Sequence, residues 1–189
     1  MGLHTSTLGH LLVDPPLNAA EERFLRGFAE TRRWDRPAGP YVVLDHPLQD
    51  DASDDHERYN RPSRHEPGLW CGWKPCLEGC CISLRSEVAT EGELWLEYLI
   101  EHFLAPGGQA ARRKGFAEFT FDHEINGVVF VEGAETRQVF AIECITNEVR
   151  GITLMPGVSM AQAWGIEDDE ERLQRRLDLL ARRRASLRR

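Results

Sequence analysis

The chain has 189 residues, of which 41% are hydrophobic and 29% are charged, and its formal net charge is −8. This length suits one domain with its own core and is a tight fit for two, so we expect a single α+β domain over residues 1–189. The acidic balance argues against nucleic acid as the main partner, because duplex binding needs a basic face. Since the chain has neither an apolar run of membrane-spanning length nor a signal-peptide pattern, we expect a cytoplasmic protein.

The first expected elements are a short strand over Leu8–Val13 and a helix over Ala19–Arg33. Asn18 is followed three residues later by Glu21, a variant of the capping box that marks the start of a helix. Apolar side chains then recur at helical spacing, with charged side chains between them. The pattern predicts an amphipathic helix that packs on the core.

Residues 35–68 predict a long loop or insert that is rich in proline and carries an acidic run over residues 50–57. One short strand is expected within it, at Tyr41–Leu44. Connections of more than about 12–15 residues without secondary structure are uncommon unless they are functional or mobile. A binding loop and a mobile insert are both consistent with this composition.

Two β-prone runs, Leu69–Pro75 and Cys80–Leu84, are separated by only four residues and predict a hairpin. A second helix is expected from about Glu91 to Leu104, with Thr90 and Glu93 as its capping box. Apolar residues cover most of its circumference. We therefore expect this helix at the centre of the core.

Residues 116–146 predict a three-stranded meander, in which Asn126-Gly127 forms a tight type I′ turn and residues 133–136 form a second turn. The expected fold is therefore α+β. An antiparallel sheet, made of the hairpin and the meander, packs against helices.

A basic helix is expected over residues 168–189, because residues 172–189 hold eight arginines and a single aspartate. Arginines near the end of a helix complement its dipole. They can also contact the acidic remainder of the chain, so the helix needs no outside partner. A contact in a homo-oligomer or with another protein, and binding of nucleic acid, are the alternatives left open.

Three segments carry a resemblance: Pro67–Trp73 with its Leu-Trp-Cys-Gly-Trp stretch, the helix Trp95–Leu104, and Ile125–Val128. Together they resemble a group of uncharacterised bacterial and phage-borne proteins. The similarity covers roughly residues 65–150. It implies a shared fold and supplies no activity.

Four of the five cysteines lie within Cys71–Cys81, a poor arrangement for disulfides that join distant segments. Zinc is most often held by pairs of cysteines with about two to four residues between them. Cys76 and Cys80 fit that spacing, with Cys71 or His65 as a further candidate ligand. Because no second pair of this kind is present, we expect packed thiols and no bound metal, with Cys71 and Cys81 in apolar surroundings. Metal ligation and redox or catalytic cysteine chemistry are the alternatives.

Asp122, His123 and Glu124 place two carboxylates and an imidazole in a row. Because alternate residues of a strand face opposite sides, Asp122 and Glu124 are expected on one face and His123 on the other. Two carboxylates on one face can act in acid–base catalysis or hold a hard cation. The alternative is the solvated face of a hairpin, which needs no function.

The leading hypothesis is a non-catalytic binding or accessory protein, in which Trp70 and Trp73 anchor a protein or small-molecule ligand. A small enzyme that uses Asp122, Glu124 or a cysteine is the first alternative, and a zinc-stabilised structural protein is the second. The chain has no P-loop, dinucleotide-binding fingerprint, nucleophile elbow or H-E-x-x-H motif, so we expect no cofactor.

Overall fold

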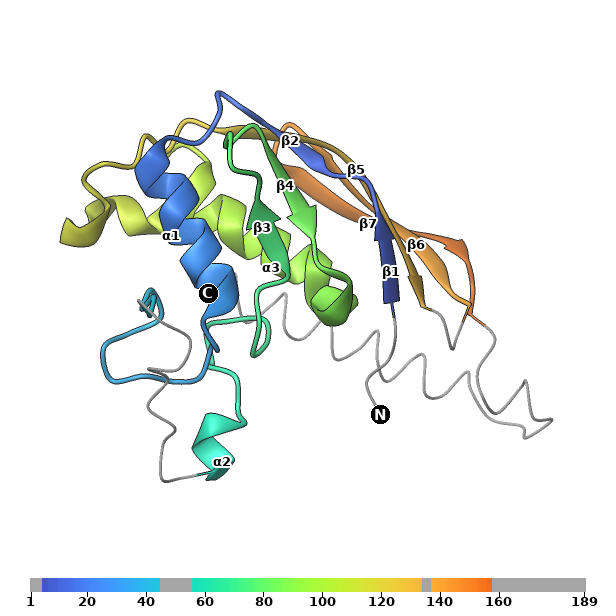
Figure 1. Ribbon diagram of the computed structural model, residues 1–189, viewed down its shortest axis with the longest axis horizontal. Coiled ribbons are helices and arrows are strands. Elements are labelled where there is room, and N and C mark those ends of the chain that lie inside the picture. The colour runs from blue at the N-terminus through green and yellow to red at the C-terminus, as the bar shows by residue number, and fades with distance from the viewer. Residues whose placement is uncertain (1–4, 45–55, 134–136, 158–189) are drawn as a thin grey trace.

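The computed structural model describes residues 5–44, 56–133 and 137–157, and a single antiparallel sheet of seven strands runs through these ranges (Figure 1). Its strands are β1 (Thr5–Leu8), β2 (Leu11–Asp14), β3 (Trp73–Pro75), β4 (Cys81–Leu84), β5 (Glu124–Gly133), β6 (Val139–Ile145) and β7 (Glu148–Met155). The strand order is β3-β4-β2-β5-β6-β7, and β1 also pairs with β5. The predicted α+β class and the β3–β4 hairpin are confirmed, and β2 joins this hairpin to the β5–β6–β7 meander.

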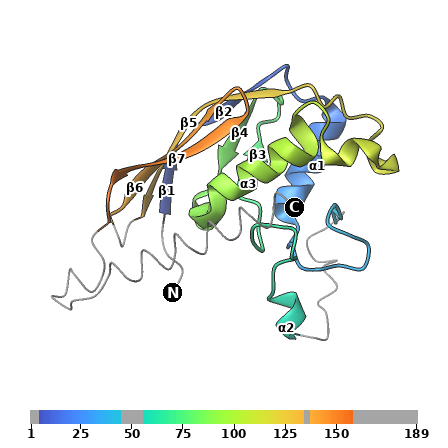
Figure 2. The ribbon, with the colours of Figure 1, turned by 180° about the vertical axis from the view of Figure 1, so that it is seen from behind.

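Helices cover one side of the curved sheet. They include α1 (Ala19–Glu30) and α3 (Gly92–Leu99), which continues as the π-helical segment η3 (Ile100–Leu104). The short helix α2 (His56–Tyr59) lies away from the sheet (Figure 1). Three short 3₁₀ turns complete the set: η2 (Ser86–Glu91), η4 (Gln109–Arg112) and η5 (Lys114–Phe116). Figure 2 shows α3 beneath the sheet, whereas α1 lies beside β3 at one end of it. Among the described strands, β7 is the last one at the opposite end of the sheet.

The core lies between the inner face of the sheet and the two long helices. Trp95 and Leu99 are buried there, as the sequence predicts for the second helix. The first residue of α3, Gly92, lies directly against β6. A Cβ at this position would lie 2.8 Å from Cδ1 of Ile142, so glycine permits this close contact. Phe103 is fully buried, and its ring contacts those of Phe24, Phe28, Tyr41, Tyr98 and Phe116.

The start of α1 confirms the predicted capping box. Oδ1 of Asn18 accepts hydrogen bonds from the backbone N–H groups of Ala20 and Glu21, and the Glu21 carboxylate accepts one from the Asn18 N–H at 2.8 Å. The helix ends earlier than predicted, at Glu30. Thr31 leaves the helical conformation, and the chain turns so that Arg33 enters the interior.

The predicted Asn126-Gly127 turn is wrong, because both residues lie within β5. This strand is long and pairs with β2 on one side and with β6 on the other. Gly127 has φ +137°, and a Cβ there would lie 3.1 Å from the carbonyl oxygen of His10, so glycine permits the close approach of β2. The tight turn lies instead at Thr146-Asn147, between β6 and β7, where both residues have positive φ.

Three smaller expectations also differ from the structure. The strand expected over Leu8–Val13 is divided into β1 and β2 at Gly9, whose φ is +103°. Tyr41–Leu44 forms no strand. The N-cap of α3 is Glu91 instead of Thr90, which lies within η2. The basic helix over residues 168–189 and most of the acidic run lie outside the described residues.

Candidate functional site

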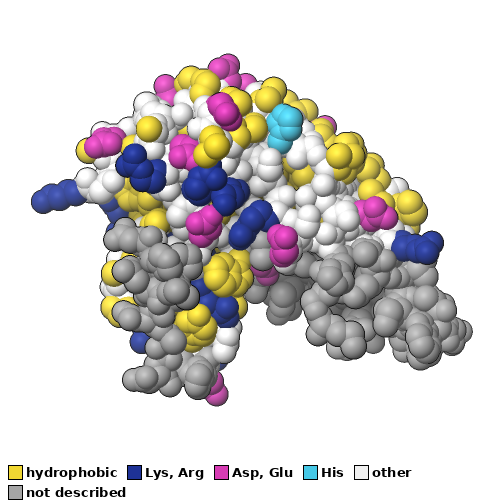
Figure 3. Space-filling view, in the orientation of Figure 1, with side chains coloured by type: hydrophobic (Ala, Val, Ile, Leu, Met, Phe, Trp, Pro, Cys, Tyr) yellow, Lys and Arg dark blue, Asp and Glu magenta, His cyan; other side chains and the backbone are white. Residues whose placement is uncertain are grey.

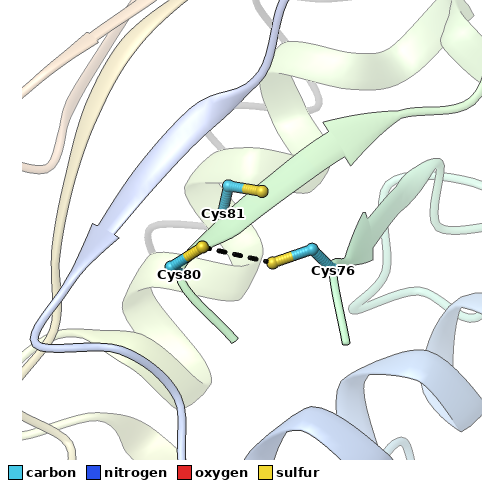
Figure 4. Close-up of side chains that lie close together, drawn as sticks. All are labelled: Cys76, Cys80 and Cys81. Carbon is cyan, nitrogen blue, oxygen red and sulfur yellow. Dashed lines mark hydrogen bonds between the residues drawn. The ribbon is translucent and has the colours of Figure 1, made fainter. Parts of the chain in front are cut away.

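Three thiols converge at the turn of the β3–β4 hairpin. The Sγ atoms of Cys76, Cys80 and Cys81 all lie within 4.8 Å of one another, and those of Cys76 and Cys80 are 3.6 Å apart (Figure 4). Four sulfurs around a tetrahedral zinc ion, each at about 2.3 Å, lie roughly 3.8 Å from one another. Small rotations of these side chains therefore suffice to bring three sulfurs to one ion. We call these residues the thiol triad.

Backbone hydrogen bonds hold the turn that carries the triad. The N–H of Cys76 donates to the carbonyl oxygen of Cys81 at 2.9 Å, so these two residues are opposite each other across the hairpin. Gly79 has φ +70° and donates to the carbonyl oxygen of Cys76 at 3.2 Å. A Cβ at Gly79 would lie 2.5 Å from the carbonyl oxygen of Leu17, so the turn is fitted closely against the start of α1. The chain itself positions the thiols.

The three thiols influence one another's protonation. Burial raises the pKa of Cys76, but hydrogen bonds with Cys81 and Cys80 outweigh it, so the net pKa is lowered. The pKa of Cys81 is raised to about 12, by burial and then by its hydrogen bond with Cys76. The hydrogen bond with Cys76 also raises the pKa of Cys80. The three thiols therefore titrate as one coupled group, in which a thiolate is stabilised by hydrogen bonds from its neighbours.

The structure brings together only part of the ligand set that the sequence suggested. Cys76 and Cys80 belong to the triad, whereas Cys71 is fully buried in the core, in the apolar surroundings expected for it. Burial raises the pKa of the Cys71 thiol to about 12. Cys81 was expected in the core and instead joins the triad. The alternation of side chains along a strand could have predicted this position of Cys81. Ile82 and Leu84 face the core, so Cys81, the neighbour of Ile82, faces the other side.

Asp122, His123 and Glu124 differ in burial, although Oδ1 of Asp122 lies 3.9 Å from Nδ1 of His123. Asp122 and Glu124 are exposed, and the carboxylate of Glu124 accepts a hydrogen bond from the Asn126 side chain at 2.7 Å. His123 is buried, with Nε2 3.1 Å from the Glu21 carboxylate and Nδ1 2.7 Å from the carbonyl oxygen of Pro15. These contacts join the start of α1 to the start of β5, which is a structural role.

The two tryptophans of the proposed binding surface differ in exposure. Trp73 is buried, and its indole N–H donates to the carbonyl oxygen of Gly92 at 2.7 Å, which fixes β3 to the start of α3. Trp70 is half-buried and lies beside the guanidinium group of Arg32. Trp73 therefore cannot anchor a partner on the surface, and the hypothesis of a paired tryptophan anchor loses one of its two residues.

A buried ion pair is a feature that the sequence did not indicate. The guanidinium group of Arg33 lies 3.6 Å from the Glu66 carboxylate, and both side chains are almost fully buried. Arg33 donates to the carbonyl oxygens of Thr31, Pro40 and Val42. Among the described residues, Oε1 of Glu66 and the hydroxyl of Tyr98 have no hydrogen-bond partner.

Burial raises the pKa of Glu66 from 4.5 to about 7, although Arg33 acts in the opposite direction. The folded state therefore keeps a proton that the unfolded chain releases between these two pH values. The raised pKa of Glu66 stabilises the folded state by up to about 3 kcal/mol. This stabilisation is complete below about pH 4.5 and is lost as the pH rises through about 7. Unfolding in urea at about pH 5 and about pH 8 measures it. We expect Glu66→Gln to gain stability relative to the parent at the higher pH, and equal pH dependence in both proteins would contradict this assignment.

In comparisons with known proteins, no family model, curated protein or solved structure matches the chain. Within the described ranges, none of the helices has the length and apolar character needed to cross a membrane.

Proposed function

We propose that this is a non-catalytic metal-binding protein that holds one thiophilic ion between Cys76, Cys80 and Cys81. The convergence of the three sulfurs within 4.8 Å carries the proposal. In the described part of the chain, no other group of three cysteine, histidine or acidic side chains converges in this way. The earlier expectation of packed thiols accounts for Cys71 but gives no reason for three thiols to meet at an exposed turn.

The donor set selects the class of ion. Thiolates favour zinc and monovalent copper over magnesium and calcium, which prefer oxygen ligands. Three protein ligands leave the fourth position of a tetrahedral zinc ion to water or to a ligand from elsewhere. The reducing cytoplasm that the sequence suggests would keep the thiols available for such an ion.

Support for a binding role, rather than catalysis, comes from the surroundings of the triad. Cys80 is exposed at the tip of the hairpin, and none of the three cysteines lines the groove described below. A catalytic metal needs an adjoining pocket that holds the substrate. At this turn, the ion itself is the ligand.

Zinc titration of the reduced protein tests the proposal. We expect one zinc ion per chain, and we expect Cys80→Ala to weaken binding at least about tenfold, because the ion loses one of three thiolates. The exposed position of Cys80 means that this change should leave the fold intact. Cys144→Ala is the matched control, since Cys144 is buried in β6 and should not affect affinity. Equal zinc affinity in the parent and in Cys80→Ala would refute the proposal.

A further inference from the structure

A groove of about 590 Å³ lies along α1, and none of the three cysteines of the thiol triad lines it. Its walls are α1, residues 43–44 and the segment 114–119, which come from three distant parts of the sequence. The volume is in the range of small-molecule sites, which run from about 300 to 1,000 Å³. The apolar lining consists of Ala20, Phe24, Val43, Leu44, Ala117 and Phe119.

The floor of the groove is fixed to the core. The ring of Phe24 packs edge-on against those of Phe103, Phe116 and Phe119, with centroid separations of 5.0, 4.9 and 5.4 Å. Because Phe103 is fully buried among other aromatic rings, Phe24 has little freedom to move. A ligand would therefore meet an apolar surface that is already formed.

The rim of the groove has an excess of positive charge. Arg23 and Lys114 are exposed and make no ion pair or hydrogen bond with the parts of the chain that the structure describes. The other charged groups of the lining are mostly engaged, since Arg26 pairs with Glu22 and Glu30 pairs with Lys74. Glu118 is the remaining carboxylate. Figure 3 shows basic side chains among acidic ones over the α1 face of a protein whose net charge is −8.

We propose that this groove binds a small amphipathic anion, with an apolar body on Phe24 and Phe119 and a carboxylate at the rim that carries Arg23 and Lys114. Apolar area removed from water provides most of the attraction, and the two cations select the charge of the head group. The site uses none of the three thiols. It gives the protein a second ligand class besides the metal ion.

Ligands that share one alkyl chain but differ in the charge of their head groups test whether the groove prefers an anion. Dodecanoate, dodecanol and dodecyltrimethylammonium share the same apolar tail, and titration calorimetry below the micellar concentration measures their binding to the full chain. We expect dodecanoate to bind at least tenfold more tightly than dodecanol, and the cationic form to bind least. Equal affinities, or no binding of dodecanoate, would overturn the proposal.

Two variants locate the binding in the groove. A Cβ at Gly115 would have no atom within 4 Å, so Gly115→Trp places its ring in open space at the groove wall and should abolish dodecanoate binding. Lys114→Glu should lower the affinity at least tenfold, whereas Arg112→Glu, an exposed change outside the lining, should not. Unchanged binding in Gly115→Trp and in Lys114→Glu would show that dodecanoate binds elsewhere.

Discussion

Replacing Phe103 by alanine should lower the free energy of unfolding by about 3–5 kcal/mol, because it removes a fully buried aromatic ring and leaves a cavity. Phe103 lies where η3 meets α1, and its ring contacts those of Phe24 and Phe28 on that helix. The change therefore weakens the contact between the two helices as well as the core. Urea unfolding followed by circular dichroism measures the loss.

Phe130→Ala is the matched control, because the same atoms are removed from a ring that is 42% exposed on the outer face of the sheet. Its cost should be well below that of Phe103→Ala. If the two variants lost the same free energy, or if Phe103→Ala lost less than about 1 kcal/mol, the proposed core would be wrong.

His123→Ala is expected to lower the free energy of unfolding by about 3 kcal/mol or more, since it leaves the buried Glu21 carboxylate without its ring partner. Glu21 also accepts from the N–H and the hydroxyl of Thr120, so part of its hydrogen bonding survives. These bonds connect the first turn of α1 to the segment before β5. Loss of the imidazole should therefore loosen both.

His10→Ala provides the control, because His10 is exposed between β1 and β2. Its effect should stay within about 0.5 kcal/mol of zero. A double-mutant cycle with Glu21→Gln then isolates the interaction between the two side chains. Additive losses in that cycle would show that Glu21 and His123 are not coupled.

Local signals in the sequence predicted much of the fold. The capping box at Asn18 located the start of α1, and two β-prone runs located the β3–β4 hairpin. The apolar circumference of the second helix predicted its central position, which the burial of Trp95 and Leu99 confirms. Each of these signals depends only on residues that are close together in the sequence, so it can be recognised from the sequence alone.

Features set by distant segments could not be predicted in this way. Asn126-Gly127 resembles a turn, but pairing with β2 and β6 on its two sides makes it part of a strand. The partner of His123 is Glu21, which lies far away in the sequence on α1. Glu66 likewise meets Arg33 only because the chain folds back.

The thiol triad was predicted in part. The spacing of Cys76 and Cys80 indicates a pair of ligands, but the sequence suggests Cys71 or His65 as the third, and the fold places Cys71 in the core. Cys81 becomes the third because it lies opposite Cys76 across the hairpin. The order of the cysteines along the chain does not show which two lie opposite each other. The register of the two strands determines it.

X-ray absorption at the zinc edge tests the central claim most directly, because it identifies the atoms bound to the ion. Reduced protein loaded with one equivalent of zinc should show three sulfur neighbours at about 2.3 Å and one lighter neighbour. Cys80→Ala should lose one of the sulfurs. A spectrum with only nitrogen and oxygen neighbours, at about 2.0–2.2 Å, would contradict metal binding by Cys76, Cys80 and Cys81.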